Sequence, residues 1–380
     1  MSEPTAAKHS SQGPFFLWHG LRVSKVLRLF ALRPPVDASR WAKLALLPFT
    51  AVWNSGWSLL ESAIYGRRIR ETVVQQPPLF VLGFWRSGTT LLHNLVTSDP
   101  AATYANYYHC LCPEHFLLTE RLVTPLTARF LPETRPMDNI QVRWDMPQED
   151  EVALCAMSLA SYYLQIVFHD DRAKYDRFLD MAECSAGERA AWKSSLDYLI
   201  RKLTFKNGKR VVLKSPSHTY KIPLLLDLYP EAKFIYIYRN PYAVFKSAVH
   251  LRRTMYEENG MCRPDFGDLD EVLLELYERA FRIYERDKAL IPPDRLVEVR
   301  YEDFEQDPLG HLERIYEALG LPGFEGLREQ VAPQVAQLRR YKKNRFASDP
   351  ERMERVYTRL REAFDKYGYP SPMEESDVAA

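Results

Sequence analysis

The sequence has few cysteines and no excess of one charge, and each absence excludes a class of protein. Its five cysteines include no CxxC pair, which argues against a disulfide framework and against a zinc site. The 51 Lys and Arg residues nearly balance the 50 Asp and Glu residues, leaving a net charge of +1. Such a chain has no overall field that attracts nucleic acid, so any anion site must be local. We expect a reduced, cytoplasmic protein that needs no metal and binds no nucleic acid.

A secretion signal and an uninterrupted apolar run are also missing. Residues 1 to 14 are small and polar, without the layout of a signal peptide, and we expect them to be disordered. Leu44 to Leu60 is apolar, but Pro48 and the triplet Asn54 to Gly56 interrupt it. At 17 residues it is also at the lower limit for a membrane span, which needs roughly 17 to 25 residues. We therefore predict no transmembrane helix.

Residues 15 to 76 form a basic, tryptophan-rich segment that we expect to be helical. Phe15 to Leu32 carries Arg22, Lys25 and Arg28 at three-residue spacing among apolar residues, which predicts a basic amphipathic helix. Residues 15 to 60 are typical of a peripheral membrane contact or of a cap over an acceptor cleft, and helices packed on the protein's own core are the alternative. Four of the seven tryptophans lie here: Trp18, Trp41, Trp53 and Trp57.

From residue 77 to residue 370, short β-branched runs alternate with helical patterns. The expected strands are Leu79 to Leu82, Arg210 to Leu213, Lys233 to Tyr238 and Leu296 to Val299. This alternation predicts an α/β fold in which helices cover both faces of a mostly parallel sheet. Residues 110 to 203 are typical of a helical insertion that would shape an acceptor site, and residues 371 to 380 of a loose tail.

A turn framed by two glycines follows the first expected strand. Gly83 and Gly88 bracket Phe84 to Ser87, and an apolar helix follows from Thr89. Backbone N–H groups in such a turn, together with the helix N-terminus, converge on an anion. The spacing is that of a Walker A loop, but Thr89 replaces its lysine and Arg86 lies inside the turn. Because the Walker lysine serves nucleoside triphosphates with magnesium, this loop indicates a site for one tetrahedral anion without a metal.

A second anion site is indicated where the strand Lys233 to Tyr238 ends. Arg239 follows the strand, Asn240 can cap the next helix, and Pro241 can open it. Ser247 lies about two turns into that helix. An arginine at a strand's carboxyl end with a helical hydroxyl beyond it is typical of a phosphate clamp, and a salt bridge is the alternative.

These segments resemble the PAPS-dependent sulfotransferases, in the branch that includes bacterial enzymes and the tyrosylprotein sulfotransferases. PAPS is 3′-phosphoadenosine-5′-phosphosulfate. The resemblance implies a P-loop-like α/β domain that transfers a sulfuryl group from PAPS to a hydroxyl or amine. It covers about residues 79 to 321 through four motifs in order: RSGTT (Arg86 to Thr90), LKSP (Leu213 to Pro216), RNPYAVFKS (Arg239 to Ser247) and RYEDF (Arg300 to Phe304).

The same resemblance implies roles for individual residues. Arg239 and Ser247 would hold the 3′-phosphate, and Tyr301 would line the nucleotide site. The 5′-phosphosulfate would be held by the loop residues Arg86, Ser87, Gly88, Thr89 and Thr90. A late basic segment that would close over the nucleotide contains Tyr341, Lys343 and Asn344.

Sulfuryl transfer needs positive charge at the leaving oxygen and a base for the acceptor's proton. Arg86 and Lys214, which ends an expected strand, are the candidates for the charge. In the tyrosylprotein relatives a glutamate follows the loop by about twenty residues, but this chain has Asn106 there. The base must come from elsewhere, and the candidates are the carboxylate cluster Glu149, Asp150 and Glu151 and the competing His218, with Glu149 or Glu151 ahead of His218.

Two other classes of function compete with sulfuryl transfer. A P-loop kinase or hydrolase would share the loop, but the Walker lysine is missing and Arg239 stands where a magnesium-binding aspartate is expected. A non-catalytic nucleotide-binding membrane scaffold would explain the amphipathic N-terminal segment. That segment also favours an amphiphile, such as a lipid, glycolipid or sterol, as the acceptor. No residue pattern indicates an oligomeric state.

Overall fold

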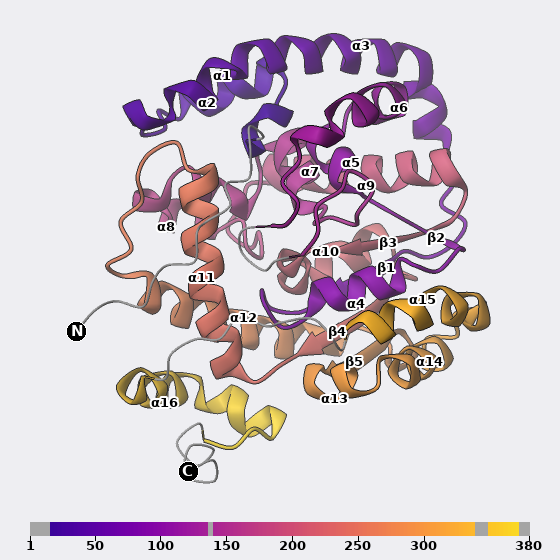
Figure 1. Ribbon diagram of the computed structural model, residues 1–380, viewed down its shortest axis with the longest axis vertical. Coiled ribbons are helices and arrows are strands. Elements are labelled where there is room, and N and C mark those ends of the chain that lie inside the picture. Colours follow the sequence, from indigo (N-terminus) through magenta and orange to yellow (C-terminus); the bar gives the residue numbers. More distant parts are fainter. Residues whose placement is uncertain (1–15, 136–139, 339–348, 372–380) are drawn as a thin grey trace.

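The computed structural model describes residues 16–135, 140–338 and 349–371, and at its centre lies a sheet of parallel strands (Figure 1). The strand order is β2-β3-β1-β4-β5. The strands are β1 (Leu79–Leu82), β2 (Ala102–Tyr104), β3 (Arg210–Lys214), β4 (Lys233–Tyr238) and β5 (Leu296–Arg300). Four of them lie where the sequence predicts a strand. The exception, β2, has three residues, too few for a periodic pattern.

Helices cover both faces of the sheet, so the predicted α/β fold with three layers is confirmed. Side chains alternate along each strand: Phe80 and Phe234 point to one face, and Val81 and Ile235 to the other. The first face packs on α9 (Ala186–Asn207), α10 (Ile222–Leu228) and α12 (Leu269–Asp287). The second face packs on α4 (Thr89–Val96), α13 (Tyr301–Gln306), α14 (Pro308–Ala318) and α15 (Phe324–Leu338).

The other helices lie around this core. They are α1 (Val23–Ala31), α2 (Trp41–Ala45), α3 (Leu47–Glu71), α5 (Tyr107–Leu111), α6 (Phe116–Thr127), α7 (Glu151–Ser158), α8 (Ala173–Asp176), α11 (Pro241–Asn259) and α16 (Pro350–Tyr367). Residues 110 to 203 contain α6, α7, α8 and most of α9, together with 3-10 turns and non-helical segments between them. The predicted disordered segment 1–14 and nearly all of the predicted tail 371–380 lie outside the described residues.

The predicted amphipathic helix from Phe15 to Leu32 is shorter than expected. A single 3-10 turn, Leu17–Gly20, precedes α1. The turn is held inward because the buried Trp18 indole N–H donates to the Asn259 carbonyl at 2.8 Å. Gly20 packs so closely that an added Cβ would lie 2.2 Å from the Leu111 carbonyl oxygen. Among the described residues, no helix has the length and apolar character needed to cross a membrane.

Polar side chains attach α3 to the rest of the protein. The Asn54 amide donates to the carbonyls of His19 at 2.7 Å and Leu21 at 3.1 Å. Glu61 forms an ion pair with Lys202 of α9, and both side chains are fully buried. Burial raises the pKa of Glu61 and lowers the pKa of Lys202 to about 8, because burial disfavours each charge. The pair fixes the rotation of α3 about its axis.

We predict that either Glu61→Gln or Lys202→Met alone destabilises the protein, because each leaves a buried charge without its partner. The expected loss is about 3–5 kcal/mol, read from the shift of the urea-unfolding midpoint. The matched control is the double variant Glu61→Leu with Lys202→Met, which removes both charges and should recover most of the loss. Single variants that unfold at the wild-type midpoint would contradict a structural role for the pair.

Candidate functional site

Three strand ends meet at one edge of the sheet. β3 and β4 pair with β1 on its two sides, with Val81 opposite Lys214 and Leu82 opposite Tyr236. Because all three strands are parallel, the segments that follow them emerge at the same edge. These segments are the turn from Gly83 to Gly88, Lys214 with the residues after it, and Arg239. Residues predicted separately from three motifs are thus brought together.

Both glycines of the turn are required by its conformation. Gly83 and Gly88 have φ angles of +147° and +104°, which residues with a Cβ rarely adopt. A Cβ would lie 2.5 Å from the Ile237 carbonyl oxygen at Gly83 and 2.2 Å from the Tyr301 ring at Gly88. Arg86 also has a positive φ, +72°, an uncommon conformation for a residue with a side chain. The turn is therefore held in one shape.

The two predicted anion-binding segments touch each other. The Arg86 Nε donates to the Ser247 Oγ at 2.8 Å, and an Arg239 guanidinium N–H donates to the Arg86 carbonyl at 3.4 Å. The Arg239 guanidinium lies 4.3 Å from the centroid of the Tyr301 ring. Among the described residues, Arg239 has no ion pair within 4.0 Å, and the salt-bridge alternative is not seen there. As predicted, the Asn240 side chain caps α11, accepting from the backbone N–H of the second and third helical residues.

The remaining loop residues lie at the start of α4. The Ser87 hydroxyl donates to the Phe84 carbonyl at 2.8 Å inside the turn. Thr89 is buried at the first position of α4, and Thr90 is half-buried beside it. Tyr341, Lys343 and Asn344 lie outside the described residues, so the predicted closing segment stays a prediction.

Glu149 and Lys214 form an ion pair next to this edge. The Lys214 Nζ lies 2.7 Å from Glu149 Oε1, and the Tyr163 hydroxyl donates to the other carboxylate oxygen. The Lys214 side chain is only 2% exposed, whereas the Glu149 side chain is 19% exposed. Burial by itself would raise the pKa of the Glu149 carboxyl, but the Lys214 ammonium and the Tyr163 hydroxyl hold that pKa below its ordinary value.

The other predicted bases lie deeper in the protein. Glu151, the first residue of α7, accepts hydrogen bonds from Ser161 at 2.6 Å and Ser217 at 2.8 Å. His218 contacts the Asp150 carboxylate at 2.6 Å, and both side chains are fully buried. The three consecutive carboxylates, expected as one cluster, therefore have three separate sets of partners.

Asn106 stands where the tyrosylprotein relatives carry a glutamate, and it has structural contacts instead. Its side-chain oxygen caps α5 by accepting from the His109 N–H at 2.8 Å. Its amide donates to Glu120 at 2.8 Å. No group of three or more His, Cys, Asp or Glu residues in the described part of the chain is placed to hold a metal ion.

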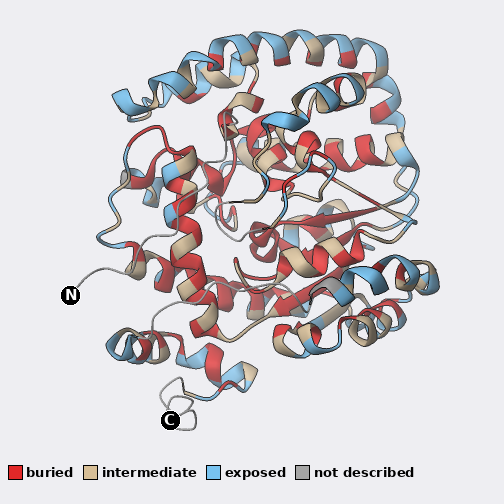
Figure 2. Ribbon diagram, viewed as in Figure 1, coloured by how far each residue is buried: buried red, intermediate tan, exposed pale blue. Residues whose placement is uncertain are grey.

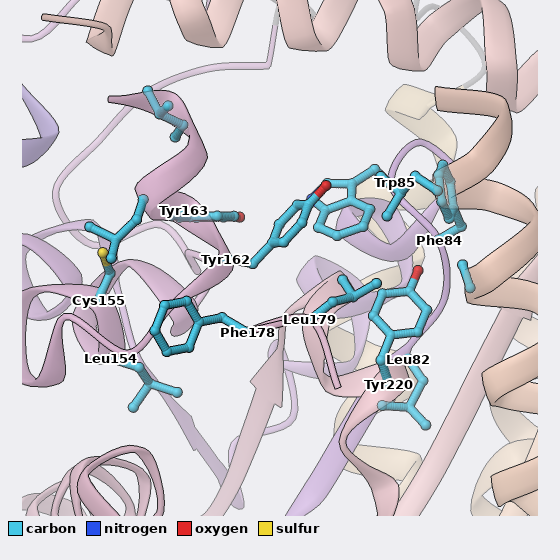
Figure 3. Close-up of a cluster of buried hydrophobic side chains, with 14 of the residues drawn as sticks. Leu82, Phe84, Trp85, Leu154, Cys155, Tyr162, Tyr163, Phe178, Leu179 and Tyr220 are labelled. Atoms are coloured by element: carbon cyan, nitrogen blue, oxygen red, sulfur yellow. The ribbon is translucent and has the colours of Figure 1, made fainter. Parts of the chain in front are cut away.

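Sequence reasoning missed the residues that support the turn. Trp85 packs between the rings of Tyr162 and Tyr220, with centroids 5.6 Å and 6.0 Å away (Figure 3). The buried Arg252 guanidinium lies 5.2 Å from the Trp85 ring and donates to the Tyr162 hydroxyl at 3.1 Å. Thr219 is hydrogen-bonded to the Gly83 N–H at 2.9 Å. These contacts join segments far apart in the sequence, so no local pattern indicates them.

Comparisons with known proteins agree with this architecture. Residues 77–326 match the family model described as "Sulfotransferase family". The Omega-hydroxy-beta-dihydromenaquinone-9 sulfotransferase Stf3 of Mycobacterium bovis is 37% identical over 354 residues, covering 93% of this chain and 91% of the relative. The Mycobacterium tuberculosis protein of the same name gives the same values.

Two solved structures share the fold. Sulfotransferase STF1 from Mycobacterium tuberculosis has a TM-score of 0.61 and 18% identity, with 83% of this chain and 89% of that chain covered. Sulfotransferase STF9 from Mycobacterium avium has a TM-score of 0.62 and 19% identity, with 92% and 97% covered. With a family match over more than half of its length and a relative aligned over nearly all of it, the chain belongs to the sulfotransferase family.

Proposed function

We propose that this sulfotransferase uses PAPS as its donor and transfers the sulfuryl group to the hydroxyl of a lipid-like acceptor. The observation that carries the donor assignment is the contact between Arg86, Ser247 and Arg239 beside the glycine-framed turn. Two arginines from different segments supply charge for two anionic groups of one nucleotide. Membership of the family leaves the kinase and scaffold alternatives without support.

The donor would lie across the edge where β1, β3 and β4 end. The turn and the first residues of α4, with Arg86, would hold the 5′-phosphosulfate through backbone N–H groups and the guanidinium. Arg239 and Ser247 would hold the 3′-phosphate, next to the Tyr301 ring. Because Thr89 replaces the Walker lysine, the turn offers no ready place for a magnesium-bound triphosphate.

Glu149 is our candidate for the base that takes the acceptor's proton. It is the one partly exposed carboxylate of its cluster, whereas Glu151 and His218 are fully buried with protein partners. Lys214, with Arg86, would stabilise negative charge on the oxygen that leaves the sulfur. When the Lys214 ammonium leaves Glu149 and pairs with the bound donor, the Glu149 carboxylate loses its counter-charge. The pKa of Glu149 then rises, and Glu149 becomes the stronger base.

The acceptor is proposed to be an apolar molecule that carries a hydroxyl group. The printed name of the Mycobacterium bovis relative is that of an Omega-hydroxy-beta-dihydromenaquinone-9 sulfotransferase, and this chain aligns with 91% of that protein. At 37% identity the acceptor of this chain need not be the same compound, but the same chemical class is expected. The exposed apolar helices of the N-terminal segment are consistent with an acceptor of this class.

The donor assignment predicts binding of the product nucleotide, 3′-phosphoadenosine-5′-phosphate, without magnesium. Titration calorimetry should give micromolar or tighter binding for the wild type. Arg239→Ala should weaken it about ten-fold or more, since a charge-assisted hydrogen bond is worth about 1.5–3 kcal/mol. The matched control is Arg295→Ala. Arg295 lies directly before the start of β5, at the edge of the sheet opposite to Arg239, and this variant should bind as the wild type does. Magnesium-dependent ATP binding without binding of this nucleotide would contradict the proposal.

The base assignment predicts that Glu149→Gln lowers kcat by about 10²–10⁴-fold, because the amide cannot take a proton. Binding of the product nucleotide should remain near the wild-type value, which calorimetry on the same preparation checks. Normal turnover in Glu149→Gln would move the assignment to Glu151 or His218, and Glu151→Gln and His218→Asn are the variants to compare next.

The pH dependence of turnover tests Glu149 as the base. Since the pKa of Glu149 is lowered in the donor-free protein, kcat/KM for PAPS should stay level from neutral pH downward and fall only below about 4.3, the ordinary value for glutamate. The kcat profile of the donor complex should fall at a higher pH, because Lys214 no longer faces the carboxylate. A kcat/KM limb at higher pH that Glu149→Gln leaves unchanged would not come from Glu149.

A further inference from the structure

The large apolar side chains that remain exposed are concentrated in one part of the protein. Of the eighteen such residues in the described chain, all but Leu290 lie between Val23 and Phe130. Most belong to α1, α2 and α3, which run side by side along the top of the molecule in Figure 1. Figure 2 shows the outward side of these helices in the colour of exposed residues. An exposed apolar area of this kind marks an interaction surface.

α3 leaves most of its large apolar side chains exposed. A helix that packs on its own protein normally turns its apolar side inward. In α3 the buried side combines small or apolar residues (Leu47, Ala51 and Ile69) with three polar ones, Asn54, Ser58 and Glu61, which are at most 5% exposed. The opposite side, which we call the apolar face of α3, consists of Phe49, Val52, Trp53, Leu59, Leu60 and Ile64, each 46% to 75% exposed.

Rotation of α3 cannot hide this apolar face. The Asn54 amide is held by two backbone carbonyls, and Glu61 is paired with Lys202 inside the protein. Turning the helix would leave these polar groups buried without partners, which opposes the rotation. Within the described part of the chain, no other segment covers this face.

Basic residues outnumber acidic residues in the N-terminal segment, although Arg22 and Lys43 are paired with Glu114 and Glu258 from other segments. Residues 15 to 76 contain nine Lys and Arg residues against three Asp and Glu residues. Of these acids, Glu61 is buried with Lys202, and Glu71 is paired with Arg67 on the helix surface. Exposed arginines lie near both ends of the apolar face, with Arg28 and Arg33 at the α1 end and Arg68 and Arg70 in the last turn of α3.

We propose that the apolar face of α3, with the neighbouring α1, docks onto the surface of a bilayer that contains anionic lipids. An apolar side bordered by basic residues and aromatic rings is typical of helices that lie in the membrane interface. Trp53 and Trp57 supply such rings, with centroids 5.5 Å apart. Because the polar half of α3 is bound to the protein, the helix lies parallel to the bilayer rather than within it.

A second copy of the chain fits this face less well than a bilayer does. In a symmetric dimer the same surface of each subunit meets its partner. The arginines at the ends of one apolar face would then approach those of the other, and like charges across an interface oppose association. Anionic headgroups complement these charges instead.

Docking also explains how a lipid alcohol could reach the site, and this part rests on the proposed function. α1 packs against α7, and α7 begins two residues after Glu149. The docked helices are thus joined directly to the element that positions the candidate base. We expect that an acceptor embedded in the bilayer presents its hydroxyl to the edge of the sheet where β1, β3 and β4 end, without crossing open water.

The test is flotation of the full-length protein with vesicles, without donor or acceptor. Vesicles of mixed phosphatidylglycerol and phosphatidylcholine should bind the wild type, less well as salt is added, and pure phosphatidylcholine should bind it less. In the double variant Phe49→Asp with Leu59→Asp, the affinity for anionic vesicles should fall by about ten-fold at least, because two exposed apolar contacts are lost. The matched control is Leu290→Asp, which changes the exposed leucine outside this region and should bind as the wild type does.

Two results would overturn docking. One is a wild type that fails to float with anionic vesicles, or a double variant that floats equally well. The other is sedimentation equilibrium that shows a wild-type dimer which Phe49→Asp with Leu59→Asp dissociates, since a second copy would then cover the face. Calorimetry with the product nucleotide on the same preparations reports folding and the donor site separately, so failure to dock is distinct from failure of the proposed function.

Discussion

The position of β1 between β3 and β4 is the constraint on which the site depends. Because all three strands are parallel, the glycine-framed turn, Lys214 and Arg239 lie at the same edge of the sheet, each directly at the end of its strand. The turn adds its own requirement, because Gly83 and Gly88 leave no room for a Cβ. A shift in strand order would separate the two anion-binding segments, whereas a change within the helical additions would leave them in place. The proposed donor site therefore depends on the sheet, whereas the proposed acceptor side depends on the added helices.

Buried charges have two distinct uses in this protein. Glu61 with Lys202, and Glu151 with its serine partners, are fully enclosed, and they fix how helices are oriented. Glu149 with Lys214 differs because its carboxylate remains partly exposed at the sheet edge. A ligand cannot reach the enclosed groups, whereas a pair that a ligand can reach can change its partners. This difference in access, rather than residue type, distinguishes a candidate base from its neighbours in the sequence.

The sequence predicts four of the five strands and the meeting of the glycine-framed turn, Lys214 and Arg239, because these depend on local patterns and on the rule that parallel strands end at one edge. It does not predict β2, which is too short, or the packing of Arg252 on Trp85, which joins distant segments. The apolar pattern of α3 is visible in the sequence, but the sequence does not show which side of the helix faces the protein. That direction is set by Lys202, far along the chain, which holds the polar side of α3 inward. The separate partners of Glu149 and Glu151 likewise depend on tertiary contacts.

Transfer itself tests the central claim most directly. Wild-type protein would be incubated with PAPS labelled with radioactive sulfur, a panel of lipid alcohols in anionic vesicles, and a metal chelator. We predict that the radioactive sulfur moves into the lipid extract. We also predict that 3′-phosphoadenosine-5′-phosphate accumulates in an amount equal to that of the sulfated lipid, since one sulfuryl group leaves each donor. Absence of label from the lipid extract, with a protein preparation that binds the product nucleotide, would contradict the lipid assignment. Transfer that occurs only when the chelator is left out would contradict the proposed metal-independent donor site.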